Sequence, residues 1–281
     1  MAEAVGAATD APWPPPAHAA QGGAPPVAAA DSMMLSGPVL SRTVPSGLVP
    51  PAPPQGTSES ALTRRDELAA FAAEVSGCSK CRLAQGRTQV VFGVGNPDAA
   101  LMFVGEAPGF HEDQQGYPFV GQAGKLLDRL LGDIGLTRDD VYIANVIKCR
   151  PPGNRDPMPD EIEACEGHLF RQIALIEPRV IATLGNFATK LLSGKQYGIT
   201  RVHGHAQDAV LGGRSVILYP LYHPAAALYT PAMLRTLEED FARLPTLLEA
   251  PVPEQQAEVI PLAVAGVAAT PAETERQLGL F

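Results

Sequence analysis

The sequence lacks long hydrophobic runs. No stretch of its 281 residues approaches the ~20 apolar residues that a membrane-spanning helix needs. The N-terminus also lacks the basic and then apolar order of a secretory signal, so we expect a cytoplasmic protein. Cysteine is scarce, at four residues, and in a reducing compartment these four are not expected to form structural disulfides.

Both ends of the chain lack the apolar periodicity of a folded domain. Residues 1–55 contain 13 alanines and 12 prolines, which bury too little surface to offset the conformational entropy of the chain. The segment after residue 249 has the same character. We therefore expect a disordered arm over residues 1–60, one compact domain over 61–248 and a disordered linker over 249–276.

The net charge of −9 is carried mainly by these ends. Residues 61–248 contain 19 lysines and arginines against 21 acidic residues, a net charge of only −2. The expected domain can therefore carry a local basic face, and a nucleic-acid partner is not excluded.

Within the expected domain, short apolar runs alternate with amphipathic ones. The first amphipathic run has one apolar helical face, formed by Leu62, Leu68, Phe71, Ala72 and Val75. Strands are predicted over 90–94, 100–105, 141–147, 180–185 and within 215–224, with helices between them and a last helix from Pro231 to about Leu248. This alternation predicts an α/β fold, a three-layer αβα sandwich with a mainly parallel central sheet.

The unusual residues of the sequence follow the predicted strands. GEAPG follows the second strand, NVIKCRPP the third and YHPAAAL the last. Sheets of this kind bind ligands at the carboxyl ends of their strands. We therefore expect the functional site at that edge.

The four cysteines form a recognisable pattern. Cys78 and Cys81 stand in a CxxC motif, and Cys149 and Cys165 follow farther along the chain. Four thiolates suit either structural zinc or an iron–sulfur cluster, and the spacing does not distinguish the two.

Basic residues accompany the cysteines on both sides. Lys148 and Arg150 flank Cys149, and further lysines and arginines lie near the CxxC motif. We interpret them as contacts for a phosphate backbone, with solvated surface charge as the alternative.

Taken together, the motifs resemble the family 4 uracil-DNA glycosylases over residues 75–245. The matching stretches are CSKCRLAQGRTQVVFG, GEAPGFHEDQQGYPFVGQAGKLLD, YIANVIKCRPPGNRDP and HPAAAL. The resemblance implies a monomeric DNA repair enzyme that hydrolyses the bond between uracil and deoxyribose in single- or double-stranded DNA. It also implies a structural [4Fe-4S] cluster on Cys78, Cys81, Cys149 and Cys165.

The chemistry of base excision assigns roles to three residues. An extruded base must be stacked and its edge must be read, and we predict Phe119 as the stacking platform. The amide of Asn145 can pair with N3–H and O4 of uracil, whereas cytosine presents the opposite polarity. The resemblance assigns His223 as the donor to uracil O2, where negative charge develops as the base leaves.

The remaining site residues are predicted from the loops around these three. The motif that matches GEAPG carries an aspartate in family 1 glycosylases where this chain has Ala107, so Glu106 is the candidate for positioning the attacking water. Glu112 is predicted to line the uracil pocket, with a solvated acidic turn as the alternative. Gly105 and Ala107 leave room for a close approach of the base, and Leu228 is the predicted wedge in the minor groove.

The chain ends in QLGLF, which is apolar for a disordered tail. Gln277, Leu278, Leu280 and Phe281 resemble the short peptide by which many bacterial DNA-processing proteins bind the replication sliding clamp. We expect this segment to bind that clamp reversibly, because ordering a free tail limits its affinity.

An alternative to the enzyme is a non-catalytic or weakly catalytic protein that binds uracil or other damage while tethered to the clamp. The alanine at position 107 is the residue that favours it. A zinc-stabilised binding protein is a third interpretation.

Overall fold

The structure is a computed structural model that describes residues 58–251, with side chains from residue 63 onward. The QLGLF segment lies outside the described residues. The predicted arm and linker also lie outside them, apart from residues 58–60 and 249–251. Within the described part of the chain, none of the helices has the length and apolar character needed to cross a lipid bilayer.

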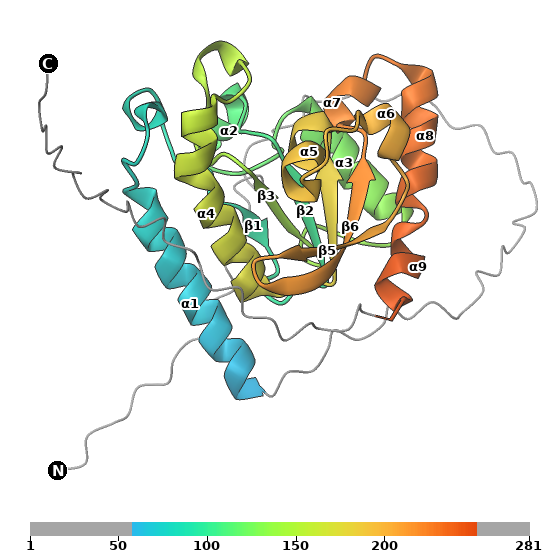
Figure 1. Cartoon of the computed structure of the whole chain (residues 1–281), viewed down its shortest axis with the longest axis horizontal. Helices are drawn as coiled ribbons and strands as arrows, with labels where there is room; N and C mark the ends of the chain where they lie inside the picture. The colour runs from blue at the N-terminus through green and yellow to red at the C-terminus, as the bar shows by residue number, and fades with distance from the viewer. Residues whose placement is uncertain (1–57, 252–281) are drawn as a thin grey trace, which may run out of the picture. The chain divides into compact units, whose positions relative to one another are not determined.

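Six strands form one sheet in the order β1-β3-β2-β4-β6-β5 (Figure 1). The four central strands are parallel to one another: β2 (Leu101–Gly105), β3 (Tyr142–Asn145), β4 (Val180–Leu184) and β6 (Arg214–Leu221). The edge strands β1 (Val94–Gly95) and β5 (Gln207–Leu211) pair antiparallel with their neighbours. β2 and β4 are buried throughout, as expected for strands covered on both faces.

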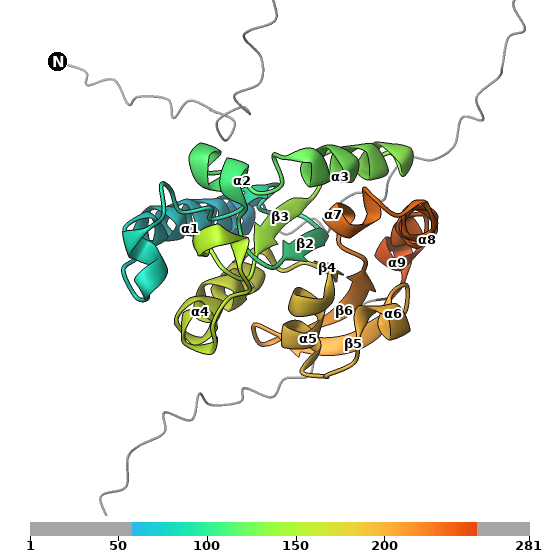
Figure 2. The same ribbon diagram turned by 90° about the horizontal axis from the view of Figure 1, so that it is seen from above.

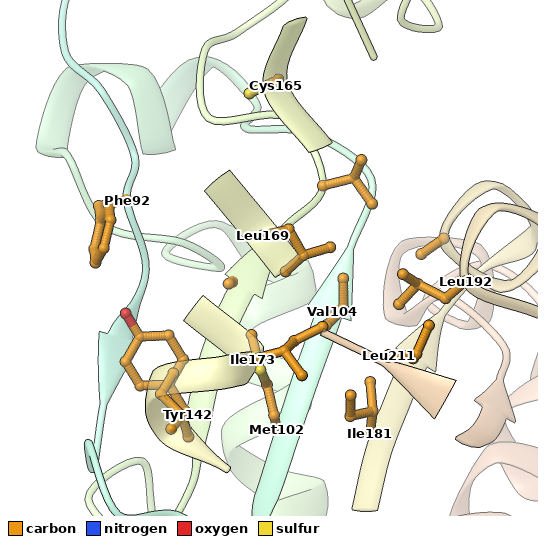
Figure 3. Packing of buried hydrophobic residues seen from close by; sticks show 14 of the residues in the cluster. Phe92, Met102, Val104, Tyr142, Cys165, Leu169, Ile173, Ile181, Leu192 and Leu211 are labelled. Carbon is orange, nitrogen blue, oxygen red and sulfur yellow. The ribbon is translucent and has the colours of Figure 1, made fainter. Parts of the chain in front are cut away.

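Helices cover both faces of the sheet (Figure 2). One buried cluster joins the sheet to α1 (Ser58–Ser76), α4 (Pro159–Ile176) and α5 (Asn186–Ser193), and Figure 3 shows part of it. The other joins the sheet to α3 (Gln122–Asp133), α8 (Pro231–Phe241) and α9 (Leu244–Glu249). The predicted three-layer α/β fold is therefore confirmed. Shorter elements connect the layers: α2 (Phe110–Gln115), α6 (Ile199–Val202), α7 (Pro224–Ala227) and the 3₁₀ turns η1 (Arg82–Gln85) and η2 (Pro152–Asn154).

The first helix buries the face that its sequence predicted. Leu68, Phe71 and Val75 are each less than 5% exposed, and α1 packs on α4. Spacing at three and four residues is therefore sufficient to orient this helix.

Three local predictions were wrong. Of the strand predicted over 90–94, only Val94 pairs with β3, because Gly93 and Gly95 have φ values of 136° and 130° that leave the regular strand region. The predicted last helix is split into α8 and α9, because Pro245 lacks the amide that a continuous helix requires. Strand β5 was not predicted, and the double-glycine turn that follows it, with φ values of 60° and 78°, is typical of a hairpin.

Candidate active site

The three segments that were expected to form the site meet at one end of the sheet. Figure 1 shows α2, α5 and α7 at the end where the parallel strands finish, and Figure 2 looks onto that end. β2 and β3 pair in register there, with Gly105 opposite Asn145. A Cβ atom on Gly105 would lie 2.4 Å from Oδ1 of Asn145 and 2.8 Å from Cζ of Phe119. The glycine therefore allows the amide and the aromatic ring to approach each other.

Phe119 has a strained backbone, with a φ of 54° in the left-handed region that phenylalanine rarely adopts. Two side chains hold this turn. Oε1 of Glu112 accepts hydrogen bonds from the amides of Val120 at 2.9 Å and Gly121 at 3.1 Å, and Arg138 donates to the carbonyl of Phe119. The ring of Phe119 is 6% exposed. The strain is stabilised from both sides, which fixes the ring at the strand ends.

These contacts exclude the alternative that was considered for Glu112 and add a residue that was not predicted. Glu112 and its neighbour Asp113 do not form a solvated acidic turn, because Asp113 is 3% exposed and accepts the Thr88 amide at 2.9 Å. Arg138 was not predicted to belong to the site. It lies in a polar segment 19 residues from Phe119, and no local signal in the sequence connects the two.

The side chain of Asn145 is 2% exposed and makes no hydrogen bond to the described residues. Its backbone carbonyl accepts a hydrogen bond from Nζ of Lys148 at 2.8 Å, so the strand end itself is held. The amide atoms are not among the fully buried unpaired atoms of the described residues, so they remain within reach of water or a ligand. The side chain therefore keeps one acceptor and one donor group available, although Asn145 is not among the residues that line the cavity around Glu106 and His223.

His223 packs against Phe119 and carries a defined proton. Its ring is offset-stacked on Phe119, with centroids 5.6 Å apart and planes at 26°. The amide of Ala225 donates to Nδ1 at 3.1 Å, so Nδ1 is the acceptor nitrogen. Burial lowers the pKa of His223 to about 4, with partial opposition from Glu112, and the ring is neutral at neutral pH. The proton therefore resides on Nε2, which is left as a hydrogen-bond donor.

Glu106 and His223 line a cavity of about 720 Å³, a volume typical of small-molecule sites. Asp156 and Lys190 line the same cavity. Burial raises the pKa of Glu106, and the negative charge of Asp156 raises it further. Asp156 was missed because it stands in a loop of charged and proline residues that resembles ordinary surface.

His203 and His205 were not predicted to belong to the site, yet His203 contacts Tyr222, directly before His223. Nδ1 of His203 lies 2.7 Å from Oδ2 of Asp240, which is 3% exposed. The ring of His203 lies against that of Tyr222, with centroids 4.5 Å apart. His205 is exposed. Of these two histidines, His203 packs against other parts of the fold and His205 lies at the surface.

The predicted wedge lies on the surface near the site. Leu228 follows α7 and is 38% exposed, and the adjacent Tyr229 is 86% exposed. Ala107 is partly buried against the core and has no group that orients water.

The four cysteines line one cavity between α1, α4 and the end of β3. Three of the sulfur atoms have nitrogen atoms nearby. Sγ of Cys149 lies 3.5 Å from Nη1 of Arg87, Sγ of Cys165 accepts from the amide of Lys148 at 3.3 Å, and Sγ of Cys78 lies 3.5 Å from Nε2 of His168. His168 was not predicted, although it stands one helical turn after Cys165.

Burial raises the pKa of the Cys149 thiol to about 11, against the opposing effect of Arg87. Burial also raises the pKa of Cys165. These thiols would lose their protons on binding a cation, as metal ligands do. Within residues 63–251, no three Cys, His, Asp or Glu side chains are arranged to hold a single metal ion.

The prediction that Lys148 contacts DNA is wrong. Lys148 is 1% exposed, and its ammonium group donates to the carbonyl of Asn145 and to Oε1 of Gln172. Gln172 in turn donates to the carbonyl of Phe92 at 2.8 Å. Lys148 is a structural bridge between the cysteine loop and the end of β3, not a surface charge.

Other basic residues near the cysteines also have partners inside the protein. Arg82 pairs with Asp160 at 2.6 Å, and Arg155 with Glu161 at 2.6 Å. Arg150 forms no ion pair with the described residues. The basic patch that the sequence suggested is therefore smaller than predicted.

Comparisons with known proteins agree with this architecture. The family model of the Uracil DNA glycosylase superfamily matches residues 92–244. A type-4 uracil-DNA glycosylase of Sulfurisphaera tokodaii is 49% identical over 191 residues, which cover 66% of this chain and 87% of the relative. The type-4 uracil-DNA glycosylase of Archaeoglobus fulgidus is 47% identical, covering 61% of this chain and 88% of the relative, and that of Thermotoga maritima is 49% identical, covering 58% and 85%.

Proposed function

The chain belongs to the type-4 family of the uracil DNA glycosylase superfamily, and we propose that it hydrolyses the N-glycosidic bond of uracil in DNA and leaves an abasic site. The observation that carries this proposal is the cluster at the strand ends that contains the ring of Phe119, the nearby amide of Asn145, which has no hydrogen-bond partner among the described residues, and the neutral ring of His223 stacked on Phe119. Together they offer the hydrogen-bonding groups that the edge of uracil requires.

Recognition begins with a uracil that has left the base stack. The base stacks on Phe119, while the amide of Asn145 accepts from N3–H and donates to O4. Cytosine would place an acceptor at N3 and a donor at N4, so both contacts would be mismatched. The close approach of Phe119 and Asn145 over Gly105 supports this assignment.

His223 stabilises the leaving group. Negative charge develops on O2 as the bond to deoxyribose breaks, and the N–H at Nε2 donates to that oxygen. A neutral donor suits this role because the Ala225 amide donates to Nδ1 and thereby fixes the ring proton on Nε2 before the reaction begins. The N-cap hydrogen bond therefore selects the useful tautomer.

Glu106 acts on the sugar side of the bond. As a carboxylate it stabilises the oxocarbenium-like sugar and accepts a hydrogen bond from the attacking water. Its position in the same cavity as His223 supports this role, and it supplies the acidic group that Ala107 does not. Glu112 contributes to the pocket indirectly, because its carboxylate accepts a hydrogen bond from Val120 and so holds the turn that carries Phe119.

Cys78, Cys81, Cys149 and Cys165 would hold a [4Fe-4S] cluster whose role is structural. Four thiols that line one cavity, with nitrogen atoms near three of the sulfurs, fit such a group. Four thiolates also suit a single zinc ion by their chemistry, but the described side chains are not arranged to hold one. A cluster binds each thiolate to a different iron, so it requires thiols spread around a cavity. Iron and sulfide analysis of the purified protein distinguishes the two.

The QLGLF segment would tether the enzyme to the replication sliding clamp. Gln277, Leu278, Leu280 and Phe281 lie outside the described residues, and the support for this proposal is their sequence alone. Tethering raises the effective concentration of the enzyme on DNA without changing its active site. Deletion of residues 277–281 should abolish capture by the clamp and leave excision from a short oligonucleotide unchanged.

The excision activity is tested with a uracil-containing oligonucleotide and alkaline cleavage of abasic sites. Wild-type protein should release uracil, and Asn145→Asp should lose selectivity against cytosine because a carboxylate cannot donate to O4. Absence of uracil release by iron-loaded, folded wild-type protein would contradict the proposed activity.

A further inference from the structure

Phe110 stands out among the phenylalanines because its ring is on the surface. It is 51% exposed, whereas no other phenylalanine of residues 63–251 is among the exposed large hydrophobic side chains. Bases of single-stranded nucleic acids stack on aromatic side chains of the proteins that bind them. Single exposed apolar side chains are common on protein surfaces, so a role for Phe110 depends on the residues around it.

Arg150 lies over this ring. Its Cζ atom is 5.1 Å from the ring centroid of Phe110, and its Nε donates to Oδ1 of Asn154 at 2.7 Å. Asn154 has a φ of 55°, a left-handed conformation that asparagine tolerates. The guanidinium is therefore held in place by a defined turn.

The charge of Arg150 also remains available. Arg82 and Arg155 each pair with a carboxylate, but Arg150 forms no ion pair within the described part of the chain. An arginine whose side chain is fixed by a neutral amide can still attract a phosphate group.

The pair lies beside the proposed uracil pocket. Phe110 begins α2 directly after the loop at the end of β2, and Arg150 follows the end of β3, the adjacent parallel strand. Glu112, in the same short helix as Phe110, holds the turn that carries Phe119. Figure 2 shows α2 at the end of the sheet where β2 and β3 finish.

We propose that Phe110 and Arg150 form a stacking platform for the base of a nucleotide that neighbours the flipped uracil. The ring offers an apolar face to any base, and the guanidinium adds a planar cation near the backbone. A neighbouring base can reach this platform only when it is unpaired, since a base pair in a duplex is covered by its own stack. The platform therefore favours single-stranded or locally opened DNA. This inference rests on the proposed function.

The test combines changes in the protein with changes in the substrate and measures kcat/KM for each combination. Single-stranded oligonucleotides carry one central uracil, with either a normal base or a base-less tetrahydrofuran residue on its 5′ or its 3′ side. For the wild-type enzyme, removal of the neighbouring base on one side should lower kcat/KM about fivefold or more, the fold-change that corresponds to one base–aromatic stack. Phe110→Leu should abolish this dependence, and Phe110→Trp should retain it.

Tyr197→Leu is the matched control. Tyr197 is 48% exposed and has the guanidinium of Arg201 at 4.7 Å, so it repeats the aromatic–arginine arrangement on the connection between α5 and α6. This variant should keep the wild-type dependence on the neighbouring base. Melting temperatures of all variants establish that each is folded.

The outcomes separate the two proposals. Uracil release by Phe110→Leu with the same dependence as the wild type would overturn the platform and leave the glycosylase intact. Equal loss of the dependence in Tyr197→Leu would also overturn it. Failure of the wild-type enzyme to release uracil from every substrate would instead overturn the proposed function.

Discussion

The candidate active site and the cysteine cavity are both lined with buried polar atoms, but the two regions treat those atoms in opposite ways. In the cysteine cavity, Arg87, the Lys148 amide and His168 each place a nitrogen atom near a sulfur. In the active site, the side chain of Asn145 is buried and has no partner among the described residues.

We call the cysteine cavity the closed region, because protein atoms already surround its sulfur atoms. We call the candidate active site the open region, because it keeps polar groups available for a ligand. A buried sulfur with nearby donors is ready to hold a permanent group, because second-shell contacts orient the ligands. In the active site, the protein's own hydrogen bonds hold the backbone instead. The backbone around Phe119 is bonded by Glu112 and Arg138, while the amide of Asn145 has no hydrogen-bond partner among the described residues.

The largest expected effect comes from breaking the closed region. If the proposed cluster is present, Cys149→Ser should prevent its assembly and strongly lower the yield of folded protein. The reason is that the binding free energy of such a centre is comparable with the ~5–15 kcal/mol that stabilises a domain. Iron content and thermal unfolding measure the loss. A Cys149→Ser protein that remains folded and iron-free with wild-type stability would contradict a structural role for the cavity.

The next effect comes from the open region. His223→Ala should lower kcat about 100- to 1,000-fold, the range for loss of one oxyanion donor, with little loss of stability. Single-turnover excision measures the change. His205→Ala is the control, because His205 is exposed and lies outside the site. Near-normal rates for His223→Ala would place the donor to O2 elsewhere.

A smaller effect should follow when a methyl group is added at Gly105, where Asn145 and Phe119 approach each other. In Gly105→Ala, the new methyl group would meet Oδ1 of Asn145 at 2.4 Å, so the amide must move. Overpacking of this kind costs about 1–3 kcal/mol, and we expect a loss of kcat/KM of about tenfold. Gly132→Ala is the matched control, since its added carbon would have no heavy atom within 4 Å among the neighbours considered. Equal activity of the two variants would show that the approach over Gly105 is not required.

The smallest effect concerns charge at the mouth of the active site. Asp156 helps to raise the pKa of Glu106, so Asp156→Asn should lower that pKa. If Glu106 acts as a carboxylate, it then stays ionised to lower pH, and the acid limb of the pH–rate profile should move to lower pH. The shift should be small because Asp156 is exposed and screened by solvent. Glu163→Gln, an exposed change on α4, should leave the profile in place, and a shift to higher pH in Asp156→Asn would contradict the assignment.

Much of the fold followed from periodicity. β2 and β4 were predicted because short continuous apolar runs are typical of strands covered on both faces, and the apolar face of α1 was predicted because a helix repeats its side-chain directions every 3.6 residues. The short antiparallel edges were not predicted correctly. The extent of β1 depends on glycine φ values, and β5 on pairing with β6 across a hairpin, and neither leaves a periodic signal.

The sequence by itself determined which residue types are available for the reaction. Phe119, Asn145 and His223 follow strands of one parallel sheet, and such strands end at the same edge, so their meeting was predictable. The four cysteines were likewise recognisable from their spacing.

Only the tertiary structure decided how the flanking residues are used. Lys148 and Arg150 are both basic and flank the same cysteine, yet one is buried against Gln172 and the other lies over Phe110 at the surface. Arg138 reaches the Phe119 turn from a distant segment, and His203 meets Asp240 across 37 residues. These contacts depend on long-range packing, which places side chains according to the neighbours that other segments bring to them, and a local stretch of sequence does not contain that information.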